Sequence, residues 1–155
     1  MMRIKITDGG AIGYLNDKLY GTKKENYLTI NAVEALYILK NNKIDSKHIN
    51  VSIEELEKKL QEKQFYKRYR VYEDLRDNGY YVKSGTKYGE QYRVYKNKKG
   101  HSKWIVFPIY EDENIKALNL IAKGRVVHST KKRLLIAIID SDNEVVYYEM
   151  DWVKI

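Results

Sequence analysis

Two residues that can exchange protons stand on either side of a basic turn in the second half of the chain. Tyr95 ends the alternating segment YRVY, and His101 follows the turn at 96–100. Because a hairpin holds the residues beside its turn close together, Tyr95 and His101 could reach a common ligand. Histidine is also the side chain whose charge changes near neutral pH, so this pair suits acid–base chemistry.

A short basic run supplies positive charge at a third place. The letters HSTKKR occupy 128–133, immediately before the apolar run 134–139. If this run forms a strand that is buried on both faces, it would hold these cations rigidly at its start. Cleavage of RNA by its own 2′-hydroxyl needs a base for that hydroxyl, an acid for the departing 5′-oxygen and a cation near the phosphorus. Tyrosine, histidine and lysine could fill these roles without a metal ion.

Each of these residues also has an ordinary structural interpretation. A single tyrosine at a strand end is usually a packing residue, and one lysine among many is usually solvated. His128 competes with His101 for the acid or base role, and spacing alone does not choose between them.

The composition favours a polyanionic partner. The 155 residues carry a formal net charge of +8, with a pI near 9.4, and they include fifteen tyrosines. Cations bind phosphates and aromatic faces stack on bases, so nucleic acid is the expected partner, although a lysine-rich solvated surface would give the same charge. The lack of cysteine excludes disulfides and thiolate zinc sites, and the presence of only three histidines argues against a His-rich metal site. We expect no metal ion and no cofactor.

The hydropathy pattern is that of a globular protein outside membranes. Hydrophobic residues make up 43% of the chain and charged residues 32%. No apolar run approaches the about 18 residues that span a bilayer, and the first letters, MMRIKITDGG, lack the apolar stretch of a secretory signal. We therefore expect a cytoplasmic protein with no membrane partner.

The first half of the chain predicts short strands and then two helices. Strands are expected near 4–6 and 27–30, with a turn at 8–10 between them. Asn31 followed by Glu34 predicts the start of a helix that ends at 41–42. A second helix should begin after Ser52, resume its apolar spacing at Tyr69 and end at Asn78-Gly79.

Strand periodicity takes over in the second half. Within one of these strands, Tyr92 and Val94 should share one face while Arg93 and Tyr95 point to the other. The acidic letters at 111–113 predict the start of a short helix through Ile121, because negative charge suits a helix N-terminus. The run 134–139 should be a buried strand, and the last strand should lie at a sheet edge or against a partner. The expected strands cover 80–83, 88–95, 103–109, 134–139 and 145–153.

Consecutive segments of the chain resemble the archaeal tRNA-splicing endonucleases. The resemblance is carried by YEDLRDNGYYVKSGTKYGEQYRVY (72–95), HSKWIVFP (101–108), RVVHSTKKRLLIAIID (125–140) and VVYYEMDWVK (145–154). It extends more loosely to NYLTINAVEALYIL (26–39), which is similar to the N-terminal domain of the family. The resemblance implies an α/β fold of the α+β type, with a small N-terminal α/β domain at 1–62 and a C-terminal mixed-sheet nuclease domain flanked by helices at 63–155.

The resemblance also implies a mechanism. Tyr95 would be the general base toward the 2′-hydroxyl, His101 the general acid and Lys132 the cation that stabilises developing negative charge, whereas His128 would be structural and Lys131 would not be catalytic. A free tyrosine ionises near pH ~10, so the tyrosine either acts with the help of nearby cations or mainly orients the hydroxyl. The reaction would be the metal-independent cleavage of bulge-helix-bulge precursor tRNA, giving 2′,3′-cyclic phosphate and 5′-hydroxyl ends.

Further residues acquire expected roles from the same resemblance. Arg125 would stack on a bulged base together with a second residue near the C-terminus, either Lys154 or Trp152. The acidic letters at 111–113 would be an assembly loop that docks on a partner, as an alternative to a helix start. The assembly would be a homotetramer or a heterotetramer with a related structural subunit. The rival hypotheses are a non-catalytic structural or RNA-binding subunit of the same assembly, and a general RNA-binding module.

Overall fold

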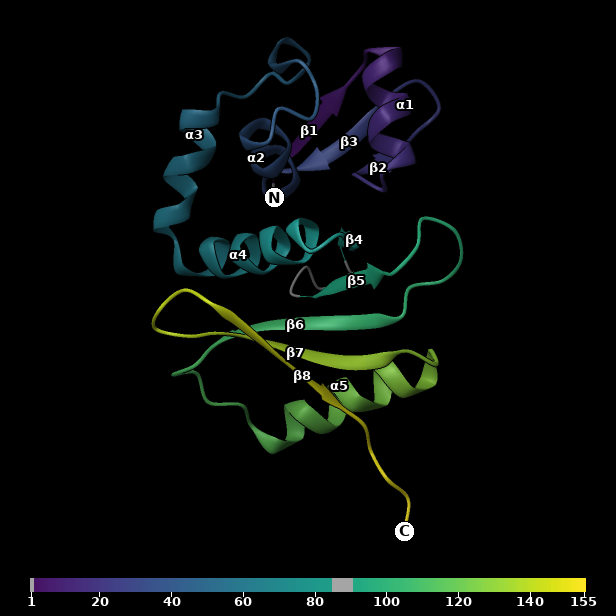
Figure 1. Ribbon diagram of the computed structural model, residues 1–155, viewed down its shortest axis with the longest axis vertical. Helices are drawn as coiled ribbons and strands as arrows, with labels where there is room; N and C mark the ends of the chain where they lie inside the picture. The colour runs from purple at the N-terminus through teal and green to yellow at the C-terminus, as the bar shows by residue number, and fades with distance from the viewer. Residues whose placement is uncertain (1, 85–90) are drawn as a thin grey trace. The chain divides into compact units, whose positions relative to one another are not determined.

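The chain forms two compact units, Met1–Glu73 and Asp74–Ile155, in a computed structural model that describes residues 2–84 and 91–155 (Figure 1). Unit 1 contains a three-stranded sheet and unit 2 a five-stranded mixed sheet, each accompanied by helices. The expected α/β fold of the α+β type is therefore confirmed. None of the helices within these ranges is long and apolar enough to cross a membrane.

The sheet of unit 1 is antiparallel, with the strand order β1-β3-β2. Its longer strands bury every second residue, as the period of two in the sequence predicts. The strands are β1 (Arg3–Ile6), β2 (Thr22–Lys23) and β3 (Leu28–Asn31).

Helix α1 (Gly9–Asp17) stands where the sequence predicted a turn at 8–10, so that prediction was wrong. Asp8 has extended backbone, and its Oδ2 accepts the N–H of Ala11 at 2.9 Å. This cap satisfies a free N–H of the first helical turn and outweighs the low helix propensity of the two glycines that follow. Ala11 and Leu15, one turn apart, are the buried residues of the helix.

Helix α2 (Ala32–Lys40) begins and ends where the sequence predicted. The Asn31 side chain accepts the N–H of Glu34 at 2.9 Å, and Glu34 Oε1 accepts the N–H of Asn31 at 3.0 Å, which completes a capping box. The buried Glu34 also accepts the N–H of Gly21 at 2.6 Å. One carboxylate therefore ties the helix start to the turn before β2.

The second predicted helix is divided in two. Helix α3 (Ile53–Lys58) follows its N-cap Ser52 as expected, and a single 3-10 turn, η2 (Lys59–Gln61), extends it. Glu62 then has extended backbone, and α4 (Lys63–Asp77) begins. The prediction of one helix over this range was wrong because apolar residues keep a helical spacing on both sides of Glu62, and no proline or glycine marks the break. A further 3-10 turn, η1 (Ser46–His48), precedes α3.

The sheet of unit 2 has the order β4-β5-β6-β7-β8. Among these described strands, β6 and β7 pair in parallel and the other neighbours are antiparallel. All five predicted strands are present, with β7 inside the sheet and β8 at its edge. Residues 88–90 of the second predicted strand lie outside the described residues, and the last strand ends at Met150 rather than at 153. The strands are β4 (Tyr81–Ser84), β5 (Tyr92–Tyr95), β6 (Trp104–Tyr110), β7 (Arg133–Ile139) and β8 (Val145–Met150).

Helix α5 (Ala117–Ser129) connects the two parallel strands, and it starts later and runs further than predicted. Its N-cap is Lys116, whereas the acidic residues at 111–113 belong to the turn that follows β6. In that turn Glu113 Oε2 accepts the N–H of Tyr110 at 2.5 Å, so the carboxylate caps a turn and not a helix. The helix start predicted at 111–113 was therefore wrong. Parallel strands need a crossover of this kind, and α5 provides it.

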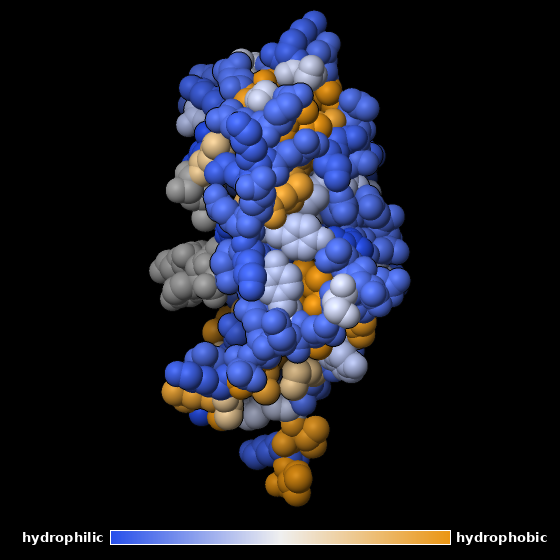
Figure 2. Space-filling view, turned by 90° about the vertical axis from the view of Figure 1, so that its left-hand side faces the viewer, coloured by the Kyte–Doolittle hydropathy of each residue, from blue (hydrophilic) through white to orange (hydrophobic). Residues whose placement is uncertain are grey.

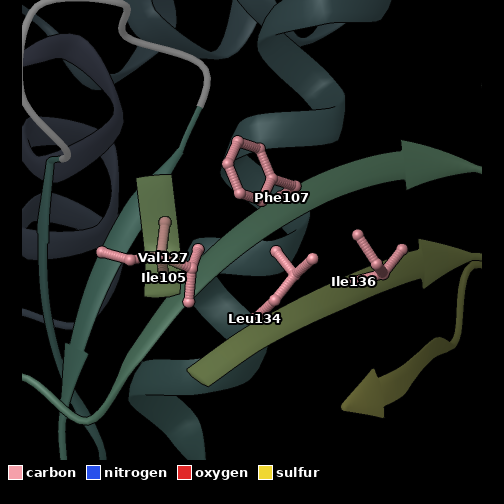
Figure 3. Close-up of a cluster of buried hydrophobic side chains, with 5 residues drawn as sticks. All are labelled: Ile105, Phe107, Val127, Leu134 and Ile136. Atoms are coloured by element: carbon pink, nitrogen blue, oxygen red, sulfur yellow. The ribbon is translucent and has the colours of Figure 1, made fainter. Parts of the chain in front are cut away.

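The core of unit 2 lies between α5 and one face of its sheet. Val127 of α5 packs against a cluster of apolar side chains from β6 and β7 (Figure 3). The parallel register places these side chains side by side in pairs, so both strands press on the same stretch of helix. The cluster consists of Ile105, Phe107, Val127, Leu134 and Ile136.

The other face of this sheet contacts the last turn of α4. The Tyr147 hydroxyl donates to Asp74 Oδ2 at 2.7 Å, and Arg76 Nη2 donates to the Val82 carbonyl at 3.0 Å. A helix on each face thus fixes the strands whose ends carry the candidate catalytic residues.

Candidate active site

Tyr95 is the last residue of β5, and its side chain is half-buried. Tyr92 and Val94 are buried while Arg93 and Tyr95 are only partly so, which confirms the predicted division of the strand between two faces. Since β5 and β6 are antiparallel, with Val94 opposite Trp104, the end of β5 lies at the start of β6.

His101 lies between the basic turn and the first residue of β6, and its side chain is exposed. Gly100 before it has φ +104°, a conformation that favours glycine, and Ser102 after it is buried. The N–H of Lys103 donates to the Val94 carbonyl at 2.9 Å and closes the hairpin. The structure therefore places His101 at the same end of the sheet as Tyr95.

Lys132 reaches this end of the sheet from a tight turn between α5 and β7. The N–H of Lys132 donates to the Val127 carbonyl at 3.0 Å, and the N–H of Lys131 donates to the His128 carbonyl at 3.1 Å. This is the Schellman pattern of a helix C-terminus. Lys131 occupies the left-handed position with φ +57°, where glycine is the usual residue. The turn thereby places Lys132 immediately before Arg133, the first residue of β7.

The ammonium group of Lys132 contacts the backbone beside His101. Lys132 Nζ donates to the Ser102 carbonyl at 2.8 Å, and the N–H of Arg133 donates to the Lys103 carbonyl at 3.0 Å. In the described part of the chain no carboxylate forms an ion pair with Lys132. A neutral carbonyl positions the ammonium without cancelling its charge, so the charge remains available to an anion.

A polar cluster ties together the strands that begin at this end. Glu149 Oε1 of β8 accepts from Trp104 Nε1 at 2.9 Å and from Arg133 Nε at 2.7 Å. The indole N–H and then the Arg133 guanidinium hold the pKa of the Glu149 carboxyl below its ordinary value. Because Trp104 and Arg133 are the first residues of β6 and β7, this carboxylate braces the starts of the strands that follow His101 and Lys132.

A pocket of about 310 Å³ opens beside Lys132, between α5 and the segment that follows β8. Arg125, His128 and Trp152 line it together with Lys132, while Lys154 is not among its lining residues. Trp152 Nε1 donates to His128 Nδ1 at 2.6 Å. Hydrophobic surface gathers around α5 and the C-terminal segment (Figure 2). The pocket therefore combines apolar walls with two cations, Arg125 and Lys132, neither of which forms an ion pair with a carboxylate of the described residues.

Comparison with known proteins identifies the family. A model of the catalytic C-terminal domain of tRNA intron endonucleases matches residues 65–147. The chain belongs to the tRNA intron endonuclease family. The tRNA-splicing endonuclease of Pyrococcus abyssi is 37% identical over 98% of this chain and 92% of its own length. That of Thermococcus kodakarensis is 37% identical over 98% and 94%, and that of Methanococcus vannielii is 39% identical over 99% and 91%.

The part of the chain that matches the tRNA intron endonuclease domain contains four of the predicted site residues. Tyr95, His101, Arg125 and Lys132 lie within 65–147, whereas Trp152 and Lys154 lie beyond it. The structure brings Tyr95, His101 and Lys132 to one end of the sheet. Arg125 lies on α5 and shares a pocket with Lys132.

The acidic residues at 111–113 lie at the opposite end of the same sheet. They follow the last residue of β6, and the N–H of Glu111 donates to the Ile139 carbonyl at 3.0 Å, at the end of β7. Their side chains are exposed. Within residues 2–84 and 91–155, no group of three or more His, Asp or Glu side chains is arranged to hold a metal ion.

Sequence reasoning did not find three contacts of this site. The hydrogen bond from Lys132 to the Ser102 carbonyl uses a backbone oxygen, and every residue has one, so the residue types do not reveal this contact. The brace made by Glu149 and the bond between His128 and Trp152 join residues far apart in the chain. Only the register of β7 against β8 could have revealed the brace, and that register was not known from the sequence.

The turn before β7 predicts different outcomes for two adjacent lysines. Lys131→Gly should raise the free energy of unfolding by about 0.5–1 kcal/mol, because glycine adopts φ +57° without strain, and it should leave RNA cleavage intact. Lys132→Met, which keeps the apolar stem and loses the charge, should lower the cleavage rate by about 10² or more. Denaturant unfolding and single-turnover cleavage measure the two effects. Loss of cleavage in Lys131→Gly with retention in Lys132→Met would reverse the assignment of the lysines.

Proposed function

We propose that this chain is the catalytic subunit of a tRNA-splicing endonuclease, which cuts bulge-helix-bulge precursor tRNA at both splice sites. The observation that carries the proposal is the common location of Tyr95, His101 and Lys132 at the joined ends of β5, β6 and β7, in a chain of this family. Residues 63–155 would form the catalytic domain and residues 1–62 the N-terminal domain.

The chemical step would be an in-line attack within the RNA. The 2′-oxygen forms a bond to the adjacent phosphorus, the bond from phosphorus to the 5′-oxygen breaks, and the products are a 2′,3′-cyclic phosphate and a 5′-hydroxyl. Tyr95 receives or orients the proton of the 2′-hydroxyl, and His101 donates a proton to the departing 5′-oxygen. No metal ion takes part.

Lys132 would stabilise the negative charge that grows on the phosphate oxygens. Its ammonium group is held by the Ser102 carbonyl, so the stabilising charge lies one residue along the backbone from the proposed proton donor His101. A cation that is positioned before the reaction needs little reorganisation in the transition state, which is the main source of electrostatic catalysis.

Recognition would depend on the shape of the RNA and on its unpaired bases. A-form helices hide most base identity, whereas bulges expose bases for stacking on aromatic rings and guanidinium planes. Arg125 forms no ion pair with any carboxylate in the described part of the chain and lines an apolar pocket, which suits such stacking. Arg125 and a second residue would form a clamp that holds the base between them. The second residue would be Trp152, which lines the same pocket, or Lys154. The clamp would serve the active site of a neighbouring subunit.

The assembly would be a tetramer, either of four copies of this chain or of two copies with two related structural subunits. The exposed acidic turn at 111–113 lies at the end of the sheet away from the candidate catalytic residues. It could therefore dock on a basic surface of a partner without obstructing the RNA, as the assembly-loop hypothesis requires.

Cleavage of a bulge-helix-bulge RNA should survive saturating EDTA, because three side chains supply the base, the acid and the positive charge. The assay follows cleavage with and without the chelator and identifies the ends of the products. A non-catalytic subunit would bind this RNA without cutting it. Loss of cleavage in EDTA that Mg²⁺ restores, with RNA folding verified separately, would rule out the metal-independent mechanism.

The two histidines near the site should differ in their effect on the chemical step. His101→Ala should lower the single-turnover rate by about 10² or more with RNA affinity nearly unchanged, as expected for a general acid. His128→Ala should reduce that rate much less, because His128 contacts Trp152 and not the sheet end. If the two effects are exchanged, the assignment of the acid is wrong.

Arg125→Ala should impair cleavage by removing a stacking contact worth about 1–3 kcal/mol. Arg125→Lys should restore it only in part, because an ammonium group keeps the charge but lacks a planar face. A phosphate contact would instead be restored largely by lysine.

A mixing experiment tests whether Arg125 acts in a neighbouring subunit. Protein with Arg125→Ala is mixed with protein carrying His101→Ala, and subunit exchange is verified by mass measurement. Cleavage should return, since one chain supplies the intact catalytic residues and the other the intact clamp. Exchange without recovery means that Arg125 acts within its own subunit.

A further inference from the structure

His128 and Trp152 form an edge-on pair at the mouth of the pocket beside α5. Trp152 Nε1 donates to His128 Nδ1 at 2.6 Å. The centroids of the two rings lie 4.5 Å apart, at an interplanar angle of 86°. Because the contact uses the edge of the indole, the faces of the indole are not covered by the imidazole. Trp152 is 59% exposed although it lines the pocket, so a face remains accessible to a planar ligand.

The backbone around Trp152 does little to fix this side chain. Strand β8 and its pairing with β7 end at Met150, and residues 151–155 belong to no helix or strand. His128, in contrast, is in the last turn of α5, which the buried Val127 anchors to the core. The bond from Trp152 to His128 therefore transfers the rigidity of α5 to a side chain on an irregular segment.

We propose that His128 is a positioning residue, which holds the indole of Trp152 as a stacking wall for an unpaired RNA base in the pocket that Arg125 also lines. This inference rests on the proposed function, because the base is the ligand that the clamp would hold. A rigid aromatic ring loses little conformational freedom when a ligand binds, so fixing the ring in advance raises affinity. The unpaired base is favoured over an apolar protein side chain because two cations, Arg125 and Lys132, line the same pocket.

The bond depends on the protonation of His128. An imidazolium carries hydrogens on both nitrogens and cannot accept from the indole, so only neutral His128 with Nδ1 free of hydrogen holds Trp152. The charged groups that line the pocket with it are Arg125 of α5, Lys132 of the following turn and Asp151 of the C-terminal segment. We therefore expect acidification to weaken the binding of bulged RNA through this contact.

The first arm of the test needs no RNA. The indole N–H resonances of the two tryptophans are recorded by ¹⁵N NMR, and Trp104→Phe identifies the signal of Trp152. His128→Leu should move the Trp152 signal to the position of a solvent-exposed indole, whereas His128→Asn should keep it shifted, because Asn Oδ1 can take the place of Nδ1. An unchanged signal in His128→Leu overturns the pairing, whatever the protein does to RNA.

The second arm measures affinity in a His101→Ala background, with a bulge-helix-bulge RNA and a fully paired RNA of equal length as probes. His128→Leu should weaken binding of the bulged RNA by about twofold to tenfold, the worth of one neutral hydrogen bond, and should leave the paired RNA unaffected. His128→Asn should restore affinity. Trp152→Phe, which keeps a ring but lacks the N–H, should weaken binding similarly and should add nothing to His128→Leu.

The pH dependence separates positioning from a merely structural role. Affinity for the bulged RNA should fall on acidification in the parent protein and should fall less in His128→Asn, because an imidazolium cannot accept the indole hydrogen bond. His48→Asn, in unit 1, is the matched control, and its affinity for the bulged RNA should change with pH as that of the parent protein does. With His101 restored, the loss in His128→Leu should appear in affinity more than in the rate at saturating RNA.

Besides an unchanged NMR signal, three results of the binding arm overturn the proposal. They are equal loss of affinity for bulged and paired RNA, failure of His128→Asn to restore binding, and a change in the mass of the assembly in place of a change in RNA affinity. The last would mean that Trp152 contacts another protein chain. Failure of the proposed function has a different signature, since the unsubstituted protein would then not cleave the bulged RNA while the NMR arm would be unaffected.

Discussion

The pairing of β6 with β5 on one side and with β7 on the other is the constraint on which the candidate site depends. An antiparallel neighbour places the end of β5 at the start of β6, and a parallel neighbour places the start of β7 there as well. Tyr95, His101 and Lys132 come from these three strand ends. A slip of one residue in either pairing would turn the side chains of a strand to the opposite face, so the buried cluster under α5 also protects the alignment of the site.

Backbone hydrogen bonds complete the positioning of the site residues that the strand pairing starts. The Schellman turn after α5 sets the path into β7, and the Ser102 carbonyl then holds the Lys132 ammonium next to His101 without neutralising it. Glu149 braces the first residues of β6 and β7 from the neighbouring edge strand. Side chains that each have an ordinary structural role elsewhere are thus brought to one end of the sheet. In the proposed function, this arrangement would join the fold to RNA cleavage.

The sequence predicted the parts of this arrangement that depend on local pattern. The capping box of Asn31, the strands of unit 2 and the hairpin between Tyr95 and His101 follow from spacing that the structure reproduces. It failed where a local signal had two physical meanings. The glycines after Asp8 indicated a turn but stand in a capped helix, and the acidic residues at 111–113 indicated a helix start but lie in a turn. Contacts between distant residues, such as His128 with Trp152, leave no local pattern at all.

In the proposed reaction the 2′-hydroxyl of the RNA is the nucleophile, and this chain activates it with its own side chains. The most direct measurement uses a bulge-helix-bulge RNA with a single 2′-deoxy nucleotide on the 5′ side of one cut and a normal ribose at the other. We expect the normal site to be cleaved to a cyclic phosphate and the deoxy site to remain intact, with the RNA bound as tightly as before. Cleavage at the deoxy site would show that water attacks the phosphorus, which would contradict the account.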